Sequence, residues 1–140
     1  MTRRPPAAAA ADQPGDLAGQ LTGLLADGAA GLLAEAAAVQ LLAGHGCWLA
    51  RADFTGPFTA AGPSPLSGQP LAHVRWKAAA RALAGGQLPA SRTEQAILRI
   101  AASLAAGVPV RLGDAVTGLD HANMAAVTTA IWRAGGHRPR

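Results

Sequence analysis

The sequence predicts an all-α fold: a single compact bundle of five to six short helices, with a long Gly/Pro loop and disordered termini. Alanine provides 36 of the 140 residues and leucine 17, and both residues favour helix. Only six valines and three isoleucines are present, which argues against a large sheet. Apolar side chains also recur at helical spacing in several segments.

The expected organisation is an arm, one domain and a tail. Residues 1–15 combine Arg, Pro, Ala and Asp without a burial pattern, so we expect a disordered arm. Residues 16–136 form the predicted helical domain, interrupted by a loop at 54–72. Residues 137–140 form a basic tail. A chain of 140 residues has little room for a second domain.

Two helices are expected before the loop. Asp16 is the predicted N-cap of the first helix, and Asp27-Gly28 is a predicted break. Residues 29–43 form the most apolar helix, in which Leu41 points nearly opposite to the main apolar stripe. We therefore expect this helix to be covered on two sides, by its own chain or by a partner.

The loop at 54–72 is predicted from its glycines and prolines, which a helix cannot cross; they are Gly56, Pro57, Gly62, Pro63, Pro65, Gly68 and Pro70. Phe54 and Phe58 are expected to anchor this loop to the core. Helical spacing then resumes over 74–83.

Three basic residues, Arg75, Lys77 and Arg81, surround Trp76 in this next helix. Nucleic-acid bases can stack on a tryptophan while basic groups hold the phosphates. The favoured alternative is a buried Trp76 beneath a solvated basic face, because tryptophan at helical spacing is usually part of the core. The cluster is therefore a candidate interaction surface, together with Leu41.

The clearest local signals lie in the C-terminal part. Ser91 to Glu94 has the form of a capping box, and Gly107 is a predicted stop. A short helix begins near Leu112, and Asp120 is the predicted N-cap of a last helix. The predicted buried stripe of that helix comprises Met124, Val127, Thr128 and Ile131.

Residues between positions 36 and 136 carry a resemblance: Trp48, Asp53-Phe54, Leu88-Pro89, Ser91, the run 98–127 and the end 134–136. This set resembles a family of small actinobacterial-type helical proteins that are hypothetical and carry no assigned activity. The resemblance implies no catalytic residue.

The net charge of +4 comes from the ends of the chain. Four arginines, Arg3, Arg4, Arg138 and Arg140, lie in the arm and tail, which leaves eight basic and eight acidic residues between them. Nucleic-acid-binding domains concentrate basic residues on the folded surface. Charge therefore supports nucleic-acid binding only weakly.

Composition also limits the compartment and the chemistry. The single cysteine, Cys47, excludes an internal disulfide and fits a reducing cytoplasm. No run of 18 uncharged apolar residues is present, so no membrane span is expected. We interpret Cys47 as a small buried hydrophobe, and Glu35 as a carboxylate paired with Arg51 or Arg99.

No metal or cofactor is expected. His45 and Cys47 offer only two zinc ligands, and the remaining histidines, His73, His121 and His137, are distant in sequence. No phosphate-binding loop, Ser/His/Asp set or paired carboxylates mark an enzyme. The sequence therefore predicts a non-catalytic module that binds another protein or a second copy of itself.

The alternative is a helix-turn-helix DNA-binding regulator built from residues 111–133. The short helix, the turn at Gly118 and the capped last helix have suitable lengths. The candidate DNA contacts are His121, Asn123, Thr129 and Arg133. The outward surface of the last helix is mostly methyl groups, however, which cannot read base edges by hydrogen bonding.

Overall fold

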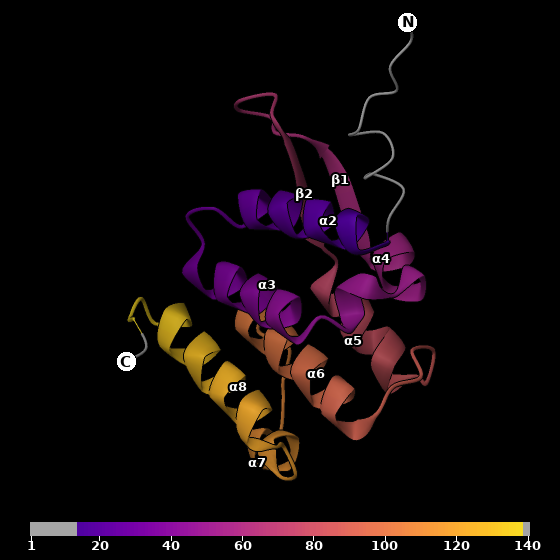
Figure 1. Ribbon diagram of the computed structural model, residues 1–140, viewed down its shortest axis with the longest axis vertical. Helices are drawn as coiled ribbons and strands as arrows, with labels where there is room; N and C mark the ends of the chain where they lie inside the picture. The colour runs from indigo at the N-terminus through magenta and orange to yellow at the C-terminus, as the bar shows by residue number, and fades with distance from the viewer. Residues whose placement is uncertain (1–13, 139–140) are drawn as a thin grey trace, which may run out of the picture.

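The computed structural model describes residues 14–138, which form seven α-helices, one 3₁₀ turn and one two-stranded sheet (Figure 1). The fold is mostly helical, and the strictly all-α prediction is wrong by one β-hairpin. Most of the predicted disordered arm and part of the basic tail lie outside the described residues. Residues 14 and 15 already belong to a helix.

Helix α3 (Leu33–His45) lies at the centre of the molecule, and both α6 (Arg92–Ala106) and α8 (His121–Ala134) pack against it (Figure 1). The expectation that this helix is covered on two sides is confirmed, and the chain itself supplies both covers. Leu41 was expected to point outward. It is instead only 3% exposed and lies next to α8.

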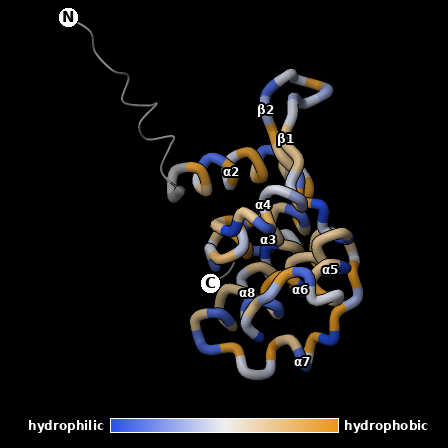
Figure 2. Tube along the Cα trace, turned by 90° about the vertical axis from the view of Figure 1, so that its right-hand side faces the viewer, coloured by the Kyte–Doolittle hydropathy of each residue, from blue (hydrophilic) through white to orange (hydrophobic). Residues whose placement is uncertain are grey.

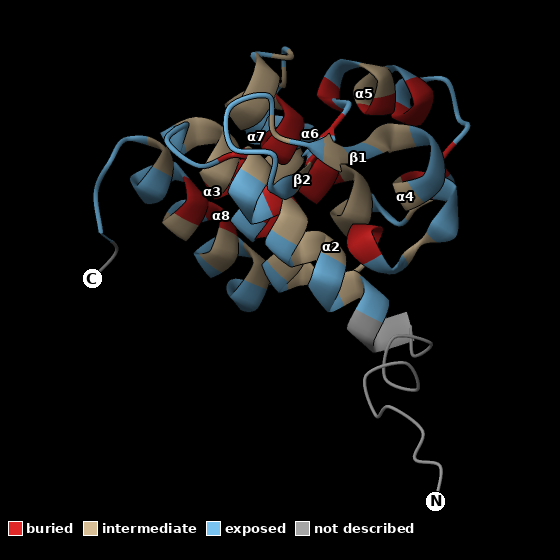
Figure 3. Cartoon of the chain, turned by 90° about the horizontal axis from the view of Figure 1, so that it is seen from above, coloured by how far each residue is buried: buried red, intermediate tan, exposed pale blue. Residues whose placement is uncertain are grey.

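Helix α3 begins four residues later than predicted, because Gly31 has a positive φ of 85° and interrupts the chain before it. Its C-terminal end is a left-handed cap at Gly46, whose amide donates to the carbonyl of Leu42 at 2.9 Å. Buried residues gather on α3, α5 (Trp76–Ala84) and α6, where these helices meet (Figure 3).

Helix α2 (Pro14–Gly28) packs against the second strand of the hairpin. It begins two residues before Asp16, so the predicted N-cap is wrong. Pro14 suits a first helical position because the amide hydrogen it lacks would have no partner there. Leu25 is 1% exposed and provides the centre of the buried face.

The C-terminal end of α2 approaches the hairpin so closely that only glycine fits. A β-carbon at Gly28 would lie 1.9 Å from the carbonyl oxygen of Ala72 and 3.0 Å from its carbonyl carbon. The predicted break at Asp27-Gly28 is confirmed, and the contact with Ala72 gives the glycine a second role.

The hairpin joins β1 (Thr59–Pro63) to β2 (Pro70–Val74) in antiparallel register, with Thr59 opposite Val74 and Pro63 opposite Pro70. The predicted loop at 54–72 is therefore wrong over most of its length. Pro63, Pro65 and Pro70 lie at the turn end of the hairpin, and each strand is an edge strand, so the missing amide donors do not interrupt the pairing. The hairpin projects from the helical body (Figure 2).

Helix α4 (Ala52–Phe58) replaces the first part of the expected loop, directly after a 3₁₀ turn at Trp48–Ala50. It contains Pro57, which lies in the last turn of a seven-residue helix and so removes only one internal hydrogen bond. Phe54 is fully buried, and its ring centroid lies 5.9 Å from that of Phe58. Both phenylalanines anchor this segment to the core, as expected.

The capping signals of the C-terminal part are confirmed. Ser91 Oγ accepts from the amide of Glu94 at 3.2 Å, and the amide of Ser91 donates to Glu94 Oε1 at 2.7 Å. Gly107 ends α6 with a φ of 68°. A short helix α7 (Leu112–Val116) follows, and Asp120 then caps α8 by accepting from the amide of Asn123 at 2.8 Å.

Helix α8 buries a different face from the one predicted. Val127 and Ala130 are buried, but Met124 and Ile131 are 37% and 48% exposed, so the predicted stripe is rotated by roughly a quarter turn. Alanines of α8 face Ala37 and Gly44 of α3 across the shared seam. Small side chains on both helices permit close approach, and the bulky side chains of α8 are left on the outside.

Candidate functional site

The outer face of α8 is the most prominent exposed apolar surface that belongs to one helix. We define this α8 outer face by Met124, Thr128, Ile131 and Trp132. At about 100° per residue, these four positions lie within roughly a third of the helix circumference. Trp132 is 48% exposed, like Ile131. Exposed apolar side chains that share one face mark interaction surfaces more often than scattered ones do.

The charged side chains nearest to the α8 outer face on this helix are those of Asp120 and Arg133, which are exposed beside its two ends. The face itself has no permanently charged side chain, and His121 lies exposed at its N-terminal end. At the other end, the ring of His137 meets the Trp132 ring edge-on, with centroids 5.6 Å apart. A β-carbon at Gly136 would lie 3.3 Å from Leu33 Cδ1, so the exposed Leu33 borders the same end.

The four candidate DNA contacts do not share one exposed surface. His121 and Arg133 are exposed, whereas Asn123 and Thr129 are partly buried. Thr129 and Arg133 line a groove of about 330 Å³ between α3 and α8, on a different side of the helix from Ile131 and Trp132. The side of α8 that is most exposed therefore presents apolar groups and few hydrogen-bonding groups.

The basic-aromatic cluster on α5 separates into two parts. Trp76 is 6% exposed and belongs to the core, so its ring offers no open surface for a stacked base. Arg75, Lys77 and Arg81 are exposed around it. Lys77 and Arg81 line an open depression between α5 and the end of α6.

A second cluster, which sequence reasoning did not identify, fastens the N-terminus of α6 to the Trp48 segment. Cys47 Sγ donates to Glu94 Oε2 at 2.6 Å, and the Trp48 indole nitrogen donates to the carbonyl of Glu94 at 2.9 Å. Trp48 is fully buried. The capping residue Glu94 thus accepts from Ser91 with one carboxylate oxygen and from Cys47 with the other.

Arg51 completes this cluster. Its guanidinium forms a bidentate pair with Asp53, at 2.8 Å and 2.6 Å, and donates to the carbonyl of Pro89 at 2.7 Å. The same group lies 4.6 Å from the centroid of the Trp48 ring. The cluster therefore joins residues 47–53 to residues 89–94.

The electrostatics of this cluster argue against a nucleophilic cysteine. Burial, followed by the hydrogen bond to Glu94, raises the pKa of Cys47 from 9.0 to about 11. The hydrogen bonds from Cys47 and Ser91 lower the pKa of Glu94 from 4.5 to about 2. A thiol beside a carboxylate stays protonated at neutral pH, and the thiolate is the reactive form. The expectation that Cys47 is simply a buried hydrophobe is wrong, because it is a partly exposed hydrogen-bond donor.

Glu35 has a different partner from those expected. Its Oε1 lies 3.7 Å from His73 Nδ1 on β2, so the contact joins α3 to the hairpin. Arg51, one of the two expected partners, pairs instead with Asp53. His73 was not expected as the partner of Glu35, because the hairpin that carries it was not predicted.

Within positions 14–138, no group of three or more His, Cys, Asp or Glu side chains lies close enough to hold a metal ion. None of the helices described there has the length and apolarity needed to cross a bilayer.

Comparison with known proteins found no matching protein-family model, no similar curated protein and no matching solved structure.

Proposed function

We propose that the protein is a non-catalytic interaction module that binds through the α8 outer face, and that the occupant of this face is a second copy of the chain. The observation that carries the proposal is the orientation of α8. The helix buries Val127 and Ala130 against the core and leaves Met124, Ile131 and Trp132 exposed. Burial of such side chains against another surface is favourable at about 25 cal/mol per Å² of apolar area.

The charge and spacing of the face favour a second copy. Because Met124, Thr128, Ile131 and Trp132 are all uncharged, two copies can pair without burying a charge or opposing like charges. A two-fold axis midway between Met124 and Ile131 places Met124 of one copy opposite Ile131 of the other. The two helices are then antiparallel, so their dipoles also oppose one another favourably.

The oligomeric state tests this proposal directly. We expect sedimentation equilibrium of the full chain to show a reversible dimer, and Ile131→Glu to return it to the monomer because a charge would enter the apolar interface. Leu66→Glu is the matched control, since Leu66 is 99% exposed at the hairpin turn, far from α8 in the fold (Figure 1). Circular dichroism checks that both variants stay folded.

The Trp132 side chain provides a second readout. Dilution of the wild-type protein should shift the tryptophan emission to longer wavelength as Trp132 returns to water. A wild-type protein that remains monomeric up to about 100 µM would overturn the proposal, because its association free energy would then be weaker than about −5.5 kcal/mol. Equal dimerisation of Ile131→Glu and wild type would also overturn it.

A further inference from the structure

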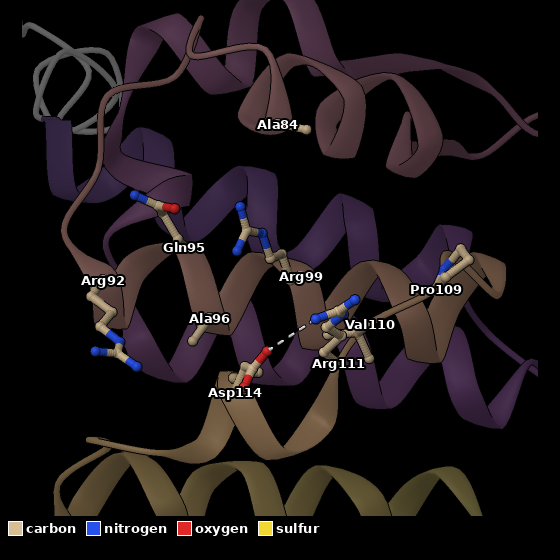
Figure 4. Close-up of a pocket in the computed structure, with 10 residues that line it drawn as sticks. Ala84, Arg92, Gln95, Ala96, Arg99, Pro109, Val110, Arg111 and Asp114 are labelled. Carbon is tan, nitrogen blue, oxygen red and sulfur yellow. Dashed lines mark ion pairs between the residues drawn. The ribbon is translucent and has the colours of Figure 1, made fainter.

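A basic groove runs along the seam between α5 and α6, away from the α8 outer face. Two open depressions form it, with volumes of about 400 Å³ and 480 Å³. Both are lined by Ala84 and Pro109, so they meet there and make one elongated groove. Figure 4 shows the first depression. Arg99 points from α6 toward Ala84 on α5, and Arg92 and Pro109 lie at opposite ends of the depression.

Five basic residues line the groove: Lys77, Arg81, Arg92, Arg99 and Arg111. They face a single lining carboxylate, that of Asp114. Asp114 pairs with Arg111 at 4.0 Å, and both side chains are largely exposed, so this pair is weak. Among residues 14–138, no carboxylate lies within ion-pairing distance of the other four basic groups, and the groove keeps a strong excess of positive charge.

The spacing of these charges matches a helix better than a single small anion. Lys77 and Arg81 are one helical turn apart, roughly 6 Å, and Arg92 and Arg99 are two turns apart, roughly 10 Å. Charges distributed in this way do not converge on one phosphate. They can pair with carboxylates at positions i, i+4 and i+7 of an opposing helix, which have the same separations.

The surface between the charges is aliphatic. Ala84, Val108, Pro109 and Val110 line the groove, and no aromatic side chain is among its lining residues. Single-stranded nucleic acid is held largely by stacking of its bases on aromatic rings, and Trp76 is buried under the neighbouring part of α5. We infer that this groove binds an acidic, amphipathic peptide segment of a partner protein, whose carboxylates meet the five basic groups and whose small apolar side chains contact the aliphatic floor.

A direct binding measurement tests this inference. The probe is a fluorescein-labelled helical peptide built only from Glu, Ala and Leu, with Glu at i, i+4 and i+7. We expect anisotropy titrations with the full chain to show saturable binding. Arg81→Glu and Arg99→Glu, one on each side of the groove, should each weaken it by about tenfold, because an attraction becomes a repulsion at close range.

Arg75→Glu is the matched control. Arg75 is exposed and lies two residues before Lys77, but it does not line the groove. This variant should bind the probe within about twofold of wild type, because the Arg75 side chain does not line the groove and an exposed charge without direct contact contributes little. Circular dichroism confirms the fold of each variant.

Three results would overturn the inference. The first is no saturable binding of the peptide by the wild-type chain. The second is equal weakening by Arg75→Glu and the two groove variants, which would show attraction to net charge alone. The third is tighter binding of an oligothymidylate than of the peptide at physiological salt. Dimerisation through α8 is a separate property, because the groove variants leave Met124, Ile131 and Trp132 intact.

Discussion

The close contact between α2 and the hairpin can be tested by adding a single methyl group at Gly28. Gly28→Ala places a methyl group 1.9 Å from the carbonyl oxygen of Ala72, whereas ordinary van der Waals contact begins near 3.4 Å. The two elements must therefore separate by up to the difference, 1.5 Å. Both atoms at the clash belong to the backbone or are fixed to it, so no side-chain rotation can relieve it. Separation also loosens the packing of Leu25, which is 1% exposed.

The expected cost follows from overpacking. Forcing an extra methyl into a packed contact costs about 1–3 kcal/mol, and alanine gains at most about 1 kcal/mol over glycine in a helix, with less at its last residue. We expect Gly28→Ala to lower the free energy of unfolding by about 2 kcal/mol and the Tm by roughly 5–10 °C. Urea unfolding followed by circular dichroism measures the first quantity.

Gly23→Ala is the control within the same helix. No atom lies within 4 Å of a β-carbon at Gly23 beyond its own helix, so this variant should gain up to about 1 kcal/mol. The same substitution should therefore lower the free energy of unfolding at position 28 and raise it at position 23, which separates the effect of the clash from the helix propensity of alanine. If Gly28→Ala were as stable as the wild type, α2 and β2 could not approach as described, and the placement of the hairpin on α2 would be wrong.

Three further predictions concern the cluster at Cys47 and the seam of α8. Glu94→Gln should cost about 1 kcal/mol at pH 7, because the hydrogen bonds from Cys47 and Ser91 lose their charged acceptor. Because the folded pKa of Glu94 is depressed from 4.5 to about 2, this difference should persist above pH 4.5 and vanish as the pH falls toward 2 in urea titrations. Iodoacetamide should label Cys47 with a midpoint near pH 11, not near 9, and a normal midpoint would contradict the burial of the thiol and its hydrogen bond to Glu94. Ala130→Leu should destabilise by about 1–3 kcal/mol in thermal unfolding, whereas Ala125→Leu, at an exposed position on the edge of the same α3–α8 groove, should change the stability by less than about 0.5 kcal/mol.

Local signals were predicted well from the sequence. The capping box at Ser91, the stop at Gly107 and the N-cap at Asp120 are all present, because each depends on residues within one helical turn. The coverage of α3 on two sides was also predictable, since a helix that is apolar all round must be buried.

Features that depend on distant partners were not predictable. The hairpin strands are only five residues long and are rich in Pro, Gly and Ala, so no alternating pattern marks them. The orientation of α8 depends on the small side chains that α3 presents to it. The spacing of apolar residues within α8 carries no information about these side chains. For the same reason, Met124, Thr128 and Ile131 of the α8 outer face were predicted to be core.

The groove along α5 and α6 shows the same limitation. Arg81 and Arg92 come from α5 and α6, and Arg111 directly precedes α7, and nothing in their spacing along the sequence brings them together. The separate elements were predicted, but their packing geometry was not, because it depends on how alanine-rich faces dock.

The three tryptophans occupy three unlike environments, and this makes the chain its own spectroscopic reporter. No tyrosine is present, so near-ultraviolet emission originates from indole alone. Trp48 and Trp76 are 0% and 6% exposed, whereas Trp132 is 48% exposed. Acrylamide should therefore quench one emitter readily and two poorly, and an occupant on the last helix should protect that one emitter while leaving the two interior signals unchanged.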